Sequence, residues 1–244
     1  MSDLETARDL YLSLLSECLI GSLIEDSVLR PYDKQRRDRG LDWPLWGISM
    51  IGRQRMAHLR KAMECVLREG VPGDVMETGV WRGGACIFMR AVLKLHGITD
   101  RRVWLADSFE GLPPPDPNSF PADSDSTLHT FDRLRASLED VRENFARYGL
   151  LDDQVMFIKG WFRDTLPTAP VSQLALLRLD GDMYESTIIT LESLYDRVSP
   201  GGFVIVDDYH GVEACRTAVH DFCARRGFRP GIEEIDGMGV YWRA

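Results

Sequence analysis

Two apolar runs that end abruptly in carboxylates constrain the fold of this chain more than any other feature. Residues 174–179 lead directly into Asp180, and residues 202–206 lead into Asp207 and Asp208. Short runs of this kind are typical of strands buried on both faces of a parallel sheet. Because ligands of open α/β sheets bind beyond the carboxyl ends of the strands, these acids are expected at a binding edge.

The rest of the chain after residue 70 alternates between strand and helix patterns. Strands are predicted at 74–80, 102–108, 154–159, 174–180 and 202–207, and helices at 84–96, 131–148, 184–198 and 211–226. A final pair of strands, 230–236 and 238–243, surrounds Gly237. This order predicts an α/β fold with a mostly parallel sheet, helices on both faces and an antiparallel hairpin at the C-terminus.

The first 70 residues form a separate segment in this interpretation. Helical periodicity covers 3–28 and 50–69, and the stretch between them is broken by Pro31, Gly40 and Pro44. We therefore divide the chain into an N-terminal helical extension, 1–70, and a second domain, 71–244. The arginine-rich stretch 35–39 is either a lid or a solvated linker.

Three aromatic side chains of the extension suit either stacking on a ligand or packing between subunits; they are Tyr32, Trp43 and Trp46. The first helix carries an apolar stripe without an obvious partner in the sheet, which favours a homodimer or higher homo-oligomer. The polar loop 112–130 is long enough to be functional or disordered.

The composition excludes several classes of protein. The chain has 244 residues, a net charge of −9 and 44% hydrophobic residues, as expected of one globular α/β domain that does not bind nucleic acid. No apolar run reaches the roughly 20 residues of a membrane helix. The five cysteines form no closely spaced pair, and the N-terminus is acidic, so a cytoplasmic protein with reduced thiols is expected.

A glycine-containing turn follows the first predicted strand and indicates a cofactor site. Gly79 ends that strand, and Gly83 opens the next helix. Trp81 stands where a dinucleotide fingerprint needs its second glycine, so a pyrophosphate is disfavoured and S-adenosylmethionine is favoured. Asp107 ends the next strand, where an acid can accept hydrogen bonds from ribose hydroxyls. The alternative is an ordinary strand-to-helix turn, with Asp107 as a cap.

The acids at the ends of the two later strands suit a hard cation such as Mg²⁺. Asp180, Asp207 and Asp208 are the candidate ligands, and Asp182 either replaces Asp180 or caps the following helix. His210 is a candidate general base because its ordinary pKa is about 6.5. Its alternative is a surface histidine in a loop.

Several motifs in co-linear order from about residue 47 onwards resemble the macrocin O-methyltransferase family. They are Glu77-Thr78-Gly79-Val80-Trp81-Arg82-Gly83-Gly84, Ala106-Asp107-Ser108-Phe109-Glu110-Gly111-Leu112-Pro113, Gly160-Trp161-Phe162-Arg163-Asp164-Thr165, Asp180-Gly181-Asp182-Met183-Tyr184-Glu185-Ser186 and Asp207-Asp208-Tyr209. The stretch 29–46 diverges. The resemblance implies a Rossmann-like methyltransferase fold with a seven-stranded sheet, S-adenosylmethionine and Mg²⁺.

The resemblance also implies roles for particular residues. Glu77, Gly79 and Gly83 would contact the methionine end of the cofactor, Asp107 the ribose, and Gly160 and Trp161 the adenine. The full expected cofactor set is Glu77, Thr78, Gly79, Gly83, Asp107, Ser108, Gly160, Trp161 and Asp180. Asp180 would serve as both metal ligand and general base, with His210 as the second candidate for the base.

The function expected from the resemblance is methyl transfer from S-adenosylmethionine to a deoxysugar hydroxyl of a glycosylated antibiotic. A metal-dependent methyltransferase acting on a phenolic or catechol hydroxyl would use the same acids, so it stays open. A Rossmann-type oxidoreductase is disfavoured by Trp81. A non-catalytic binding protein would have no reason to keep a cluster of mutually repelling acids. The sequence does not identify the acceptor.

Overall fold

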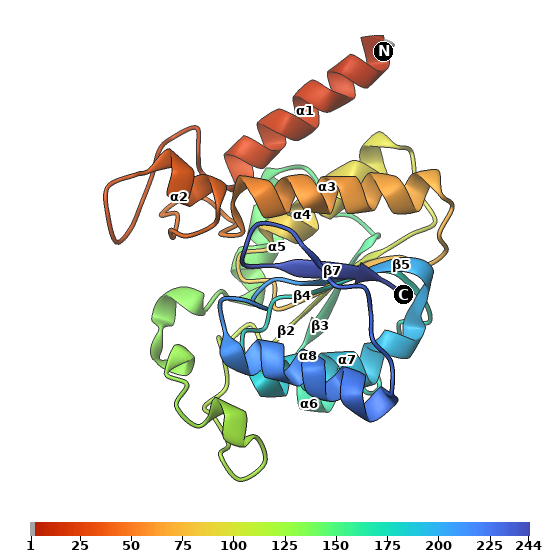
Figure 1. Ribbon diagram of the computed structural model, residues 1–244. Coiled ribbons are helices and arrows are strands. Elements are labelled where there is room, and N and C mark those ends of the chain that lie inside the picture. Colours follow the sequence, from red (N-terminus) through yellow and green to blue (C-terminus); the bar gives the residue numbers. More distant parts are fainter. Residues whose placement is uncertain (1–2) are drawn as a thin grey trace.

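Seven strands form one central sheet in the computed structural model, which describes residues 3–244 (Figure 1). The strands are β1 (Asp74–Thr78), β2 (Val103–Asp107), β3 (Val155–Lys159), β4 (Leu174–Leu179), β5 (Val198–Val206), β6 (Glu233–Glu234) and β7 (Val240–Arg243). Their order is β3-β2-β1-β4-β5-β7-β6. The first five strands run parallel, whereas β7 is antiparallel to both β5 and β6. The predicted sheet is confirmed.

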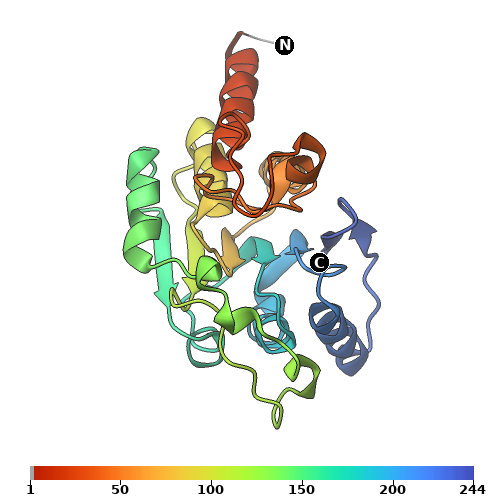
Figure 2. The same ribbon diagram turned by 90° about the vertical axis from the view of Figure 1, so that its left-hand side faces the viewer.

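Helices cover both faces of this sheet (Figures 1 and 2). They are α1 (Asp3–Leu19), α2 (Lys34–Asp38), α3 (Gly52–Arg68), α4 (Gly84–Leu95), α5 (Leu138–Arg147), α6 (Phe162–Thr165), α7 (Tyr184–Leu194) and α8 (Glu213–Arg226). Helices α3, α4 and α5 contribute to the apolar core on one face, and α7 and α8 to the core on the other. The Rossmann-like arrangement expected from the alternating pattern is confirmed.

Some predicted boundaries were wrong, for local reasons. The first helix ends at Leu19 rather than residue 28, because Gly21 turns the chain with φ +70°. The helix predicted from 131 begins only at Leu138, where Ser137 and Asp140 form a capping box. Before it, the chain makes two 3₁₀ turns, η2 (Leu128–Thr130) and η3 (Asp132–Leu134). The helix predicted to reach residue 198 ends at Leu194, since Val198 already begins β5.

Helix α1 leans away from the body of the molecule and packs against it with only part of its length (Figure 1). Leu12, Leu15 and Leu19 are buried in the core shared with α3 and α4. Leu10 and Leu14 remain 68% and 55% exposed. Within residues 3–244, no helix is both long and apolar enough to cross a membrane.

A half-buried histidine on α3 makes the stability of the fold sensitive to acid. The His58 ring lies against Tyr241, with ring centroids 4.3 Å apart, and burial lowers its pKa from 6.5 to about 4. The unfolded chain therefore binds a proton that the folded chain excludes between these two values, so stability falls as the pH drops from 6.5 towards 4. We expect this contribution to be about 2 kcal/mol, since the ring is only partly buried.

The variant His58→Phe keeps a ring at this position and removes the titrating group. Urea unfolding at pH 7 and pH 4.5 should therefore show a smaller acid-induced loss in this variant than in the wild type. An equal loss in both proteins would contradict the assignment.

Candidate active site

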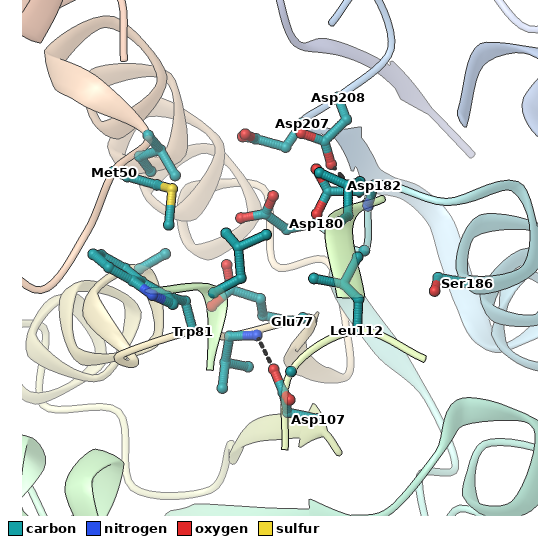
Figure 3. Close-up of a pocket in the computed structure, with 18 of the residues that line it drawn as sticks. Met50, Glu77, Trp81, Asp107, Leu112, Asp180, Asp182, Ser186, Asp207 and Asp208 are labelled. Carbon is teal, nitrogen blue, oxygen red and sulfur yellow. Dashed lines mark hydrogen bonds between the residues drawn. The ribbon is translucent and has the colours of Figure 1, made fainter. Parts of the chain in front are cut away.

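The register of the sheet brings the predicted acids together at the carboxyl ends of the strands. Leu179 of β4 pairs with Val206 of β5, so the residues that follow each of them, Asp180 and Asp207, leave the sheet side by side. Side-chain oxygens of Asp180, Asp207 and Asp208 lie within 4.8 Å of one another (Figure 3). The predicted convergence of these three acids is therefore present in the fold.

These acids border a cavity that also receives the ends of β1 and β2 (Figure 3). The predicted site residues that line it are Glu77, Gly79, Asp107, Ser108, Trp161, Asp180, Asp182, Asp207 and Asp208. The N-terminal segment adds Trp43 and residues 48–51 to the lining, and the long connection between β2 and α5 adds Leu112, Pro113, Leu128 and Leu134. The cavity is thus lined by several acids and by apolar side chains from two other segments of the chain.

Two buried arginines hold part of the acid cluster. Arg178 of β4 is 1% exposed and forms ion pairs with Glu77, Asp180 and Asp207. Arg55 of α3 pairs with the other oxygen of Asp207. Each Asp207 oxygen therefore accepts one guanidinium hydrogen bond and keeps lone pairs for a further partner.

The remaining acids of the cluster lack such partners. Within residues 3–244, no basic side chain forms an ion pair with Asp182 or Asp208, although the Asp182 N–H donates to Asp208 Oδ2 at 3.2 Å. Burial, followed by the charges of Asp180 and Asp207, raises the pKa of Asp182 to about 7. Burial and the neighbouring aspartates likewise raise the pKa of Asp208 well above its usual range.

A divalent cation fits this donor set. The carboxylates of Glu77, Asp180, Asp182, Asp207 and Asp208 outnumber the two guanidinium groups, and their oxygens are hard ligands of the type that Mg²⁺ prefers. The cation would offset the repulsion among the acids. Asp180, Asp207 and Asp208 are the residues that would hold it, because one side-chain oxygen of each lies within 4.8 Å of the others.

Near the ends of β1 and β2, the cavity is lined by Glu77, which is buried, and by Asp107, which is half-buried. Glu77 is buried beside Arg178 and Cys86, and its burial raises its pKa. Asp107 accepts hydrogen bonds from the N–H groups of Val80 and Phe109, each at 2.8 Å. Both carboxylates can accept hydrogen bonds from amine or hydroxyl groups, which S-adenosylmethionine carries, so the lining of the cavity fits that cofactor.

Four predicted site residues do not line the cavity. The Thr78 hydroxyl lies 3.4 Å from that of Thr190, and Gly160 sits in the turn before α6 with φ +138°. A Cβ on Gly83 would lie 2.9 Å from Val141 Cγ1, so that glycine permits the approach of α5. His210 lies beside Glu234, with Nε2 3.4 Å from Oε1. The roles predicted for these four residues stay predictions.

Gly79 lines the cavity but also has a packing role. Its φ is +84°, and a Cβ there would lie 1.9 Å from the carbonyl oxygen of Asp180. Any side chain would therefore push apart the ends of β1 and β4, so this glycine maintains the geometry of the acid cluster.

The two arginines that organise the site were not among the residues predicted from the sequence. Arg178 had a signal, since it is the one charged residue in the run 174–179. Arg55 had none, because it lies on α3 and meets Asp207 152 residues further along the chain. Arg55 also donates to the carbonyl oxygens of Arg39 and Gly40, at 3.3 and 3.2 Å. It thus connects the N-terminal segment to the acids.

The arginine-rich stretch is folded rather than a solvated linker. Arg37 is 1% exposed, pairs with Asp26 and Asp42, and donates to the carbonyl oxygen of Ile20 at 2.6 Å. These bonds tie residues 20–42 into one unit, and the neighbouring Trp43 borders the cavity. The lid function predicted for this stretch stays a prediction.

The fold and the site together define a methyltransferase of the Rossmann-like class, an architecture that implies S-adenosylmethionine as the methyl donor. The chain belongs to the Macrocin-O-methyltransferase (TylF) family, whose model matches residues 24–244. It is accordingly an O-methyltransferase, as its relatives are.

Two characterised relatives match almost the whole chain. An 8-demethyl-8-(2,3-dimethoxy-alpha-L-rhamnosyl)-tetracenomycin-C 4'-O-methyltransferase of Streptomyces olivaceus is 53% identical, over 98% of this chain and 94% of that protein. Mycinamicin III 3''-O-methyltransferase of Micromonospora griseorubida is 47% identical, over 98% and 97%. The solved structure of the O-methyltransferase NovP matches with a TM-score of 0.94 and 47% identity, over 97% of this chain and 98% of that one.

Proposed function

We propose that this protein transfers a methyl group from S-adenosylmethionine to a deoxysugar hydroxyl of a glycosylated natural product, with Mg²⁺ held by Asp180, Asp207 and Asp208. The observation that carries the proposal is the convergence of these three acids in the same cavity as Glu77 and Asp107. The relatives support a sugar as the acceptor, because the names of two of them specify a primed ring position.

The methyl transfer needs an acceptor oxygen that loses its proton. The new bond joins this oxygen to the methyl carbon, the carbon–sulfur bond breaks, and S-adenosylhomocysteine leaves. A sugar hydroxyl is too weak an acid to ionise unaided, so a base must lie within reach. When bound, Mg²⁺ supplies a positive charge that lowers the pKa of such a hydroxyl.

We infer that Asp182 takes the proton. It lines the cavity, and among residues 3–244 it has no cationic partner, whereas Asp180 is paired with Arg178 at 2.7 Å. This assignment departs from the expectation that Asp180 acts as both ligand and base. His210, the other candidate, contributes nothing to the cavity lining and faces Glu234.

The metal assignment predicts that chelation stops the reaction. Excess EDTA should lower the methyl-transfer rate by about 10² or more, and added Mg²⁺ should restore it, because the acceptor would lose the charge that acidifies it. Calorimetry should show Mg²⁺ binding to the wild type, weaker binding to Asp208→Asn, and unchanged binding to Asp153→Asn. Asp153 precedes β3 at the opposite edge of the sheet. Full activity in EDTA would exclude the metal role.

The acceptor is best sought among glycosides related to those of the relatives. A deoxysugar would occupy the cavity next to Asp182, and the apolar wall formed by Trp43, Leu112 and Leu134 suits the attached aglycone. A phenolic acceptor would be served by the same acids. The position of the methyl group in the product, on the sugar or on the aglycone, distinguishes the two.

We also propose that the chain forms a homo-oligomer through α1. Leu4, Leu10 and Leu14 are 60%, 68% and 55% exposed on one helix, a stripe that water disfavours. The double variant Leu10→Glu/Leu14→Glu should therefore be smaller than the wild type in light-scattering measurements, whereas Leu23→Glu, beyond the helix, should not be. A wild type that is already monomeric would contradict this proposal. The five cysteines are free of disulfides, and three of them are buried, which supports a cytoplasmic location.

A further inference from the structure

The long loop between β2 and α5 borders the cavity. It contributes Leu112, Pro113, Leu128 and Leu134 to the lining. Near its end, the Trp81 indole N–H donates to the carbonyl oxygen of Arg133 at 2.8 Å. The middle of the loop must be anchored elsewhere if the lining residues are to keep their places.

Asp123 supplies that anchor. It lies in the 3₁₀ turn η1 (Pro121–Asp123) and is 2% exposed. Its Oδ1 accepts the N–H of Tyr184 at 2.8 Å, and its Oδ2 accepts the N–H of Glu185 at 2.9 Å. Both side-chain oxygens are thus committed to the first two residues of α7.

This contact replaces a local helix cap. Met183 occupies the N-cap position of α7 and makes no side-chain capping bond. The helix therefore takes its capping carboxylate from a loop residue 61 positions earlier in the chain than Tyr184. An apolar contact accompanies it, since the rings of Phe120 and Tyr184 lie 6.2 Å apart.

The start of α7 is continuous with the turn that carries the acids. Asp182 adopts φ +58°, and the Met183 N–H donates to the carbonyl oxygen of Gly181 at 2.6 Å. Glu185 and Ser186, in the first turn of the helix, line the cavity themselves. One buried carboxylate consequently connects the loop wall of the cavity to the turn that bears Asp182.

We propose that Asp123 is a positioning residue that sets the loop 112–135 against the acid-bearing turn and so places the acceptor for methyl transfer. This role rests on the proposed function. Asp123 should affect binding of the acceptor more than binding of the donor. Glu77 is held by Arg178, and Asp107 by the Val80 N–H, so neither depends on the loop.

The test compares Asp123→Ala and Asp123→Asn with the control Val66→Ala. Asparagine keeps one acceptor oxygen but turns an amide NH₂ towards the second backbone N–H, so it should have an intermediate effect. Val66 is fully buried on α3, on the opposite face of the sheet, so its truncation destabilises the protein without touching the loop. Hydrogen exchange, acceptor kinetics and donor binding are measured for each variant.

For Asp123→Ala we expect amide exchange in 112–135 and at the start of α7 to accelerate by about tenfold, and acceptor KM to rise by about tenfold, because the loop no longer holds the bound geometry. Donor Kd should stay within about twofold of the wild type. Val66→Ala should show neither effect at a comparable loss of stability.

Unchanged loop exchange in Asp123→Ala would overturn the proposal, and so would equal changes in Val66→Ala. If the wild type methylated no glycoside, the proposed function would fail by itself, since loop exchange can be measured without an acceptor.

Discussion

Replacing Asp182 by Asn is expected to lower kcat by about 10²–10⁴, the usual cost of losing a general base. The amide is nearly isosteric with the carboxylate but cannot accept a proton. Because Asp182 forms no ion pair among the described residues, its replacement leaves the arginine network intact. Binding of S-adenosylmethionine and of Mg²⁺, measured by calorimetry, should therefore remain close to the wild type.

Two further variants separate the candidate bases. Asp180→Asn should also abolish methyl transfer, but it should weaken Mg²⁺ binding as well, because Asp180 is assigned as a ligand. His210→Gln should keep most of the activity. If His210→Gln lost activity as Asp182→Asn is expected to, or if Asp182→Asn kept wild-type turnover, the assignment of the base would be wrong.

Replacing Arg178 by Met is expected to destabilise the fold by about 3–5 kcal/mol, the range typical of breaking a buried ion pair from one side. The methionine can fill the space but leaves Glu77, Asp180 and Asp207 with much less compensating charge. Urea unfolding at pH 7.5 measures the loss.

The surface pair of Arg147 and Glu143 provides the control, since both side chains are more than half exposed. Arg147→Met should cost less than about 1 kcal/mol, as exposed ion pairs do. A loss below about 1 kcal/mol for Arg178→Met would contradict the role given to Arg178 as the charge that compensates these acids.

The sheet and the acid cluster were predictable because they depend on local patterns. An apolar run that ends in a carboxylate indicates both a buried strand and the edge at which it ends, so the sequence alone predicts that Asp180 and Asp207 lie close together. The C-terminal hairpin was also predictable from a local pattern, because Gly237 separates two short strand-like segments. The cofactor turn was only partly predictable. Gly79 borders the cavity as expected, whereas Gly83 permits helix packing.

The features that could not be predicted from the sequence depend on contacts between residues that are far apart in the chain. No periodicity indicates that Arg55 reaches Asp207, or that Asp123 caps a helix that begins 61 residues later. The folding of the segment 20–42 rests on the burial of Arg37, which a charge run does not predict because such runs are usually solvated. The proposed division of roles between Asp180 and Asp182 likewise depends on the position of Arg178, which pairs with Asp180.

The most direct test of the account is the mass and structure of the product formed with S-adenosylmethionine and Mg²⁺ from a panel of deoxysugar glycosides. The substrates named for the two relatives belong in this panel. We predict that at least one glycoside gains a single methyl group, located by NMR on a sugar oxygen, and that EDTA prevents the gain. Methylation of an aglycone phenol, or no product from a protein that binds both donor and metal, would contradict the proposed function.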